Sequence, residues 1–118
     1  QTLRHLVFAM DKWFTAPILG ERFHPIGLPN TGSLEFAWPD LDYELKPTVA
    51  EVLAVRADRV ARFRDHLATV AATDLARPVD VLENGPHPVQ ECIHTVFEEE
   101  FWHNRYALRD LTLLEATA

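Results

Sequence analysis

Apolar residues recur at intervals of three and four along three long segments of the chain, which is the spacing of helices with one buried face. These segments run from about Leu3 to Phe14, from about Thr48 to Ala72, and from about Pro88 to Glu115. The second begins with Thr48 and Glu51 at the spacing of a capping box, a common helix start. No segment shows a convincing strand pattern, so we predict an all-α bundle.

The apolar face of the last predicted helix contains two polar residues, Glu99 and His103. Seven residues lie on this face: Val89, Cys92, Val96, Glu99, His103, Tyr106 and Asp110. A carboxylate buried without a partner is costly, so it is normally paired, hydrogen-bonded, protonated or bound to a cation. The pair lies about one turn apart and therefore indicates a metal site. The alternative is a slightly rotated face, with Glu98, Glu99 and Glu100 all in contact with water.

A long connector separates the first two predicted helices. Prolines and glycines are so frequent between Pro17 and Lys46 that no long helix can form there. The connector also contains large apolar residues: Phe23, Ile26, Leu28, Phe36 and Trp38. Because this composition suits a packed loop better than a solvated linker, we expect it to fold over one end of the helices. It then serves either as a functional cover or as a shield for the core. The shorter segment from Thr73 to His87 is predicted to be a turn region.

Length and composition predict a single domain over residues 1–118, because 47% hydrophobic content is enough for one core. The net charge of -7 disfavours a nucleic-acid partner. No apolar run approaches the roughly 20 residues that span a bilayer. The single cysteine, Cys92, excludes an intramolecular disulfide, and we expect it to be a buried thiol. We therefore expect a cytoplasmic domain without membrane contact.

The second predicted helix carries a cluster of arginines: Arg56, Arg59, Arg62 and Arg64. These residues alternate with Asp58 and Asp65. We interpret the pattern as a solvated helix face with intrahelical ion pairs, since opposite charges three or four residues apart are neighbours on a helix surface.

A rival metal motif overlaps the first. Glu100 and His103 have the Glu-x-x-His spacing of di-iron bundles, and Glu21 and His24 repeat it. The second copy is flanked by glycine and proline and cannot lie within a helix, and no pair of further inward-facing carboxylates is found. We therefore favour a mononuclear site. His24 and His87 each precede a proline in a loop, from which either can approach the site, although nothing in the sequence requires it.

Three segments together resemble the DinB-like metal-binding four-helix bundles: LRHLVFAMDKWF (3–14), HPIGLP (24–29) and EEEFWHNRYALRDL (98–111). The likeness extends over nearly the whole chain and is greatest to the actinobacterial branch, related to mycothiol-dependent maleylpyruvate isomerases. It implies an up-and-down bundle in which three side chains bind one divalent metal. A histidine of the family's second helix is one ligand, and two residues four apart on the fourth helix are the others. The matching positions are His5, Glu99 and His103.

The chain departs from the family's best-known pattern at Glu99, where that pattern has histidine. Glutamate is a competent ligand, and two histidines with one glutamate form a known open catalytic zinc set. The carboxylate adds negative charge and favours harder cations than histidine does. Zinc or nickel is nevertheless the expected metal. The chain begins at Gln1 within a helix-like pattern, so we expect a preceding segment, which the resemblance implies is the family's first helix.

The resemblance also implies a function. An open metal site leaves a position for water or a substrate thiol, so we expect a thiol-dependent S-transferase or isomerase that uses a low-molecular-weight thiol such as mycothiol. Tyr106, Arg109 and Asp110 are expected to support the ligands or anchor a carboxylated substrate, unless they make surface contacts. The alternative is a non-catalytic small-molecule-binding or protein-interaction module with a structural, vestigial or absent metal. Apolar balance and family habit favour a homodimer.

Overall fold

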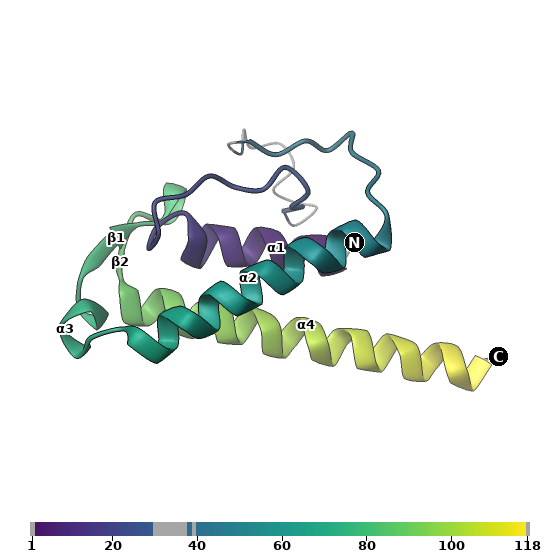
Figure 1. Cartoon of the computed structure of the whole chain (residues 1–118). Helices are drawn as coiled ribbons and strands as arrows, with labels where there is room; N and C mark the ends of the chain where they lie inside the picture. Colours follow the sequence, from purple (N-terminus) through teal and green to yellow (C-terminus); the bar gives the residue numbers. More distant parts are fainter. Residues whose placement is uncertain (1, 30–37, 39, 118) are drawn as a thin grey trace.

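Three long helical segments dominate the computed structural model, which describes residues 2–29, 38 and 40–117 (Figure 1). Helix α1 (Thr2–Met10) continues as a π-helical turn (Asp11–Thr15), and the other two are α2 (Val49–Thr69) and α4 (Val89–Thr117). Helix α1 contacts both α2 and α4. The predicted all-α class and the three predicted helices are confirmed.

Helix α2 begins where the capping-box spacing predicts. The Thr48 hydroxyl accepts a hydrogen bond from the Glu51 N–H at 3.1 Å and donates one to the Glu51 carboxylate at 3.1 Å. One of the backbone donors that a helix leaves unpaired in its first turn is thereby satisfied.

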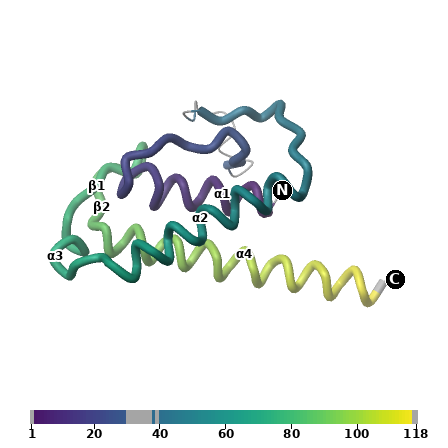
Figure 2. Tube along the Cα trace, in the orientation of Figure 1, coloured from purple at the N-terminus to yellow at the C-terminus, as the bar shows by residue number. Residues whose placement is uncertain are grey.

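The segment predicted as a turn region contains regular structure as well. A short helix, α3 (Ala72–Leu75), precedes a hairpin of two three-residue strands, β1 (Pro78–Asp80) and β2 (Pro86–Pro88). A 3₁₀ turn (Leu82–Asn84) joins the strands. Figure 2 shows the chain passing from α2 through α3 and this hairpin into α4. Strands this short, with prolines at their ends, leave no alternating pattern to detect in the sequence.

The long connector is packed, as its apolar residues predict. Phe23 and Ile26 are buried, and Trp38 packs edge-on against Phe8 with the ring centroids 5.0 Å apart. Phe36 lies outside the described residues. The described part of the connector runs back along the length of α1 instead of covering one end of the helices (Figure 1). It therefore reaches the turn of α1 that carries His5, where the Leu28 N–H donates to the Arg4 carbonyl.

The main core lies where α1, α2, α4 and the hairpin meet. Nine buried residues form it: Met10, Phe14, Phe63, Val79, Val81, Val89, Cys92, Ile93 and Val96. A smaller cluster of Val7, Ile26 and Val52 joins α1 to the connector and to α2. Cys92 is a free, fully buried thiol, as expected, and burial raises its pKa. Within the described residues, no helix has the length and apolar character needed to cross a membrane.

The inward face of α4 ends at His103. Three apolar residues of this face are fully buried: Val89, Cys92 and Val96. Tyr106, by contrast, is 45% exposed and Asp110 is exposed, so the predicted continuation of the inward face to Asp110 is wrong. The reason is that α4 extends past the ends of α1 and α2 (Figure 1). Helical periodicity identifies a face but not the length over which a neighbour covers it.

Candidate metal centre

His5 of α1 meets Glu99 and His103 of α4 in a small polar group between the two helices. One ligand-type atom from each residue lies within 4.8 Å of the others. The Glu99 Oε2 atom is 3.0 Å from His103 Nε2 and 3.5 Å from His5 Nε2. The two imidazole ring centroids are 4.5 Å apart. Residues separated by 94 and 98 positions in the sequence are thus brought within ligand distance of one metal ion.

Local sequence accounts for the placement of all three side chains. His5 begins the buried run of α1 that continues through Met10, so its ring turns toward the core. Glu99 and His103 lie four residues apart and therefore project from the same face of α4. They follow Val96 on this face, one turn beyond the apolar core. The group therefore lies at the edge of the core, where the side chains are 11%, 30% and 24% exposed in chain order.

A backbone carbonyl determines which nitrogen of His5 faces the group. His5 Nδ1 is 3.0 Å from the Leu28 carbonyl oxygen. A carbonyl oxygen only accepts hydrogen bonds, so Nδ1 carries the hydrogen and Nε2 of the neutral ring presents a lone pair. This Nε2 is buried without a hydrogen-bond partner and faces the Glu99 carboxylate. Two acceptors that face each other in a partly buried site require a shared cation, either a proton or a metal ion.

The donor set fits a divalent metal. Neighbouring ligands of a tetrahedral zinc ion, with bonds of about 2.0–2.2 Å, are about 3.3–3.6 Å apart, close to the separations of Glu99 from the two histidines. When a proton rather than a metal ion lies between His5 Nε2 and Glu99, hydrogen bonding to His5 lowers the pKa of Glu99, and the charges of His5 and His103 lower it further, although burial opposes this effect. The carboxylate is therefore ionised at neutral pH, as a metal ligand must be.

A cavity of about 530 Å³ adjoins His103. Its lining combines apolar side chains with one ion pair: Leu3, Leu6, Phe97 and Phe101, with Arg56 and Glu100. A volume of this size is within the range of small-molecule sites. The cavity reaches the polar group through His103, while His5 and Glu99 are not among its lining residues.

The three residues predicted to support the site lie beyond it. The Tyr106 ring packs edge-on against His103, with the centroids 5.9 Å apart. Arg109 and Asp110 are exposed and pair with each other at 3.1 Å, and the Arg109 guanidinium lies over the Tyr106 ring. Only Tyr106 of the three has a ring contact with a residue of the group in the part of the chain that the structure describes. The roles of Arg109 and Asp110 toward ligands or substrate stay predictions.

The residues of the rival motif have other partners. Glu100 pairs with Arg56, and Glu21 pairs with Arg62. His24 and His87 are outside the group of donors found among the described residues. These pairings leave the mononuclear arrangement as the one that the geometry supports.

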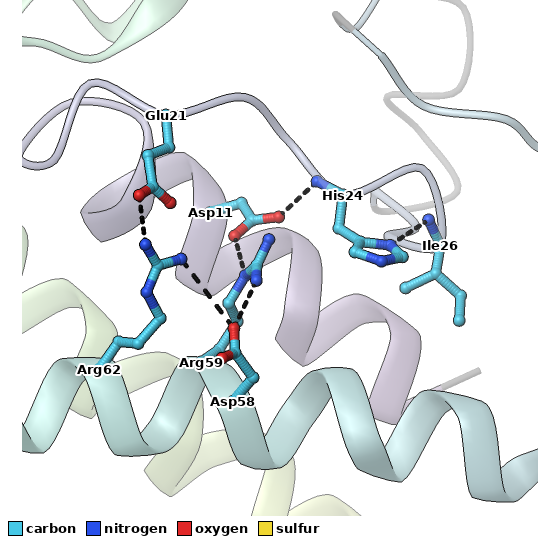
Figure 3. A network of polar contacts seen from close by, with 7 residues as sticks. All are labelled: Asp11, Glu21, His24, Ile26, Asp58, Arg59 and Arg62. Carbon is cyan, nitrogen blue, oxygen red and sulfur yellow. Dashed lines mark hydrogen bonds and ion pairs between the residues drawn. The ribbon is translucent and has the colours of Figure 1, made fainter.

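Sequence reasoning missed a polar network around Asp11, the residue that follows α1 (Figure 3). Asp11 is fully buried, and Arg59 Nε donates to its Oδ1 atom at 2.9 Å. The N–H of His24 donates to the other oxygen, Oδ2, at 2.8 Å. The interpretation of the arginine cluster as a solvated face is therefore wrong for Arg59, whose side chain is only 11% exposed. It is also wrong for Arg56, which is 18% exposed and pairs with Glu100 of α4. A signal was present, since Asp11 is a lone acid within an apolar run and needs a cation.

The His24→Asn substitution is expected to reduce the acid dependence of stability. Burial lowers the pKa of His24, and its Nδ1 accepts a hydrogen bond from the Ile26 N–H at 3.1 Å. The unfolded chain therefore takes up the proton first as pH falls. Stability contributed by the neutral ring is complete above the unfolded pKa of about 6.5 and is lost as pH drops from there toward the lower folded pKa. Urea unfolding over this pH range measures the slope.

The matched control is His94→Asn, because the His94 side chain is 73% exposed. This variant should retain the slope of the wild-type chain. Equal slopes in wild type and His24→Asn would contradict the assignment of the acid dependence to His24.

The comparisons with known proteins gave one match. The sequence model of the DinB superfamily matches residues 1–107 of the 118. Neither the curated proteins nor the solved structures contain a match. The matched region includes all three residues of the polar group.

Proposed function

Because the chain belongs to the DinB superfamily, we propose that it binds one divalent metal ion through His5, Glu99 and His103. The observation that carries this proposal is the unpartnered Nε2 of His5, which faces the Glu99 carboxylate with His103 on its other side. An ion at this point satisfies all three groups. Two nitrogen donors and one oxygen donor suit zinc or nickel.

The site further supports a catalytic role, as a thiol-dependent S-transferase or isomerase of the mycothiol type. Structural zinc sites are closed by four protein ligands, whereas catalytic sites keep a position for water or substrate. Three donors converge here within the described part of the chain, and the cavity beside His103 gives access to the site. A bound divalent metal supplies one chemical function, which is to lower the pKa of a coordinated thiol or water.

Cobalt titration tests both the proposed metal binding and the proposed catalytic role. Co²⁺ added to chelator-treated protein should bind at one ion per chain, with visible absorption of a low-symmetry site. Subsequent addition of 2-mercaptoethanol should produce thiolate-to-cobalt charge-transfer absorption if a coordination position is exchangeable. Absence of cobalt binding after reconstitution would contradict the metal proposal. Cobalt binding without a thiol band would contradict the catalytic one and favour a structural ion.

A further inference from the structure

We propose that the buried Asp11–Arg59 ion pair is a positioning device for His5, acting through the loop of residues 24–28. The pair does not touch the polar group. It is joined to His5 by a continuous series of hydrogen bonds and close packing contacts that ends at the Leu28 carbonyl. As a statement about metal binding, this inference rests on the proposed function.

The first step is the attachment of the loop to two helices at Asp11. Each carboxylate oxygen has its own donor, the Arg59 Nε atom of α2 and the His24 N–H of the loop (Figure 3). Arg59 also donates to Asp58 at 2.7 Å, so its orientation is fixed from a second side. A charge-assisted hydrogen bond in a buried environment is stronger and geometrically more restrictive than an exposed one. The start of the loop is therefore held at a fixed position next to the π-helical turn that continues α1.

The second step is the close packing of the loop along α1 toward His5. Arg4 Nε donates to the Ile26 carbonyl at 2.7 Å, and the Leu28 N–H donates to the Arg4 carbonyl at 3.2 Å. Between these contacts, a Cβ atom added at Gly27 would lie 3.1 Å from Phe8 Cβ and 3.2 Å from Phe8 Cα. A larger residue would therefore press on the helix at Phe8 and force the loop and the helix apart by a few tenths of an ångström. Residues 24–28 thus have little freedom to shift relative to α1.

The third step is the hydrogen bond from His5 Nδ1 to the Leu28 carbonyl. A hydrogen bond of this kind fixes both the tautomer and the ring orientation of a metal-binding histidine. If the loop moves, Nδ1 loses its acceptor, and the ring can place its hydrogen on Nε2 instead. A hydrogen on Nε2 blocks the nitrogen that faces Glu99. The ion pair therefore controls the availability of a ligand to which it makes no direct contact.

Two independent perturbations of the loop test this proposal. The double variant Asp11→Asn/Arg59→Gln removes both charges together, so that no unpaired charge is left buried. Gly27→Ala leaves the ion pair intact and displaces the loop from Phe8. The control is Glu21→Gln, which removes the exposed ion pair between the start of the connector and Arg62 of α2. Circular dichroism and thermal melts establish that each variant is folded.

Two measurements are made on each folded variant. Zinc affinity, from competition with a chelator, should fall about 10–100-fold in the double variant and in Gly27→Ala, and it should be unchanged in Glu21→Gln. ¹⁵N NMR of the His5 ring in metal-free protein, at a pH at which the ring is neutral, should show the Nδ1–H tautomer in wild type and a mixture in the two perturbed variants. A purely structural role of the ion pair would lower stability without moving the tautomer.

Wild-type affinity and an unchanged tautomer in both folded variants would overturn the proposal. An equal loss of affinity in Glu21→Gln would also overturn it, because the effect would then belong to any contact of the connector. If the wild-type chain binds no zinc, the proposed function fails, and the tautomer measured without metal decides the positioning role alone. A mixture in the variants then supports that role, and an unchanged tautomer overturns it.

Discussion

Replacing His103 with alanine is expected to abolish stoichiometric metal binding. Only two protein ligands are left in the group, Glu99 and His5, and the position nearest the cavity loses its imidazole. Changing a residue that merely supports a ligand typically costs about 10–100-fold in metal affinity, so loss of a ligand should cost more than about 100-fold. Elemental mass spectrometry of purified, reconstituted protein measures the effect as metal per chain. The wild-type chain should be close to one, and the variant should be at background.

The control for this substitution is His94→Ala on the same helix. The His94 side chain is 73% exposed and pairs with Glu98, away from the polar group. Its removal should leave the metal content at the wild-type level. Equal metal content in wild type and His103→Ala would contradict the ligand assignment, and equal loss in both histidine variants would indicate adventitious binding at surface imidazoles.

Replacing Phe14 with alanine is expected to lower the free energy of unfolding by about 3–5 kcal/mol. Phe14 is fully buried at the centre of the main core. Its ring packs edge-on against Phe63, with the centroids 5.1 Å apart, and against His66 at 5.3 Å. The substitution removes the transfer free energy of a large apolar group and leaves a cavity between the π-helical turn and α2. Since small domains are stable by only about 5–15 kcal/mol, this loss is a large fraction of the total.

Urea unfolding followed by circular dichroism, in the presence of a chelator, measures this loss without a contribution from metal. Leu113→Ala is the matched control, because Leu113 is 59% exposed. The control should change the free energy of unfolding by less than about 0.5 kcal/mol. A loss below about 1 kcal/mol in Phe14→Ala would contradict the expectation that burial of Phe14 contributes strongly to the free energy of unfolding.

The sequence predicts the helices well because their signals are local. The apolar spacing and the Thr48–Glu51 cap each depend on residues within one or two turns. The hairpin between α2 and α4 escaped detection, since its three-residue strands are defined by their mutual pairing and not by their own pattern. The path of the connector along α1 likewise depends on contacts between distant residues.

The three residues of the polar group were predicted from helical spacing and from the family resemblance. The network around Asp11 was not predicted. Periodicity alone places Glu99 and His103 on one face of α4, and the resemblance supplies His5. The buried partner of Arg59 is 48 positions away in the sequence, whereas Asp58 offers a carboxylate to both Arg59 and Arg62 within one turn. Local spacing therefore favours an intrahelical interpretation, although the actual choice of partner depends on the distance between α1 and α2. Asp11, a charge among buried residues, was the stronger signal.

Under the proposed metal binding, the division of the polar group between two helices makes the free metal concentration a determinant of the folding equilibrium. Glu99 and His103 share one helix and stay together as long as α4 is helical, whereas His5 reaches them only when α1 is docked. Undocking α1 therefore destroys the complete ligand set, and the ion favours the assembled state by mass action. Above the dissociation constant, each tenfold rise in free metal should add about 1.4 kcal/mol to the free energy of unfolding. The melting temperature of this chain would then report the metal supply of its surroundings.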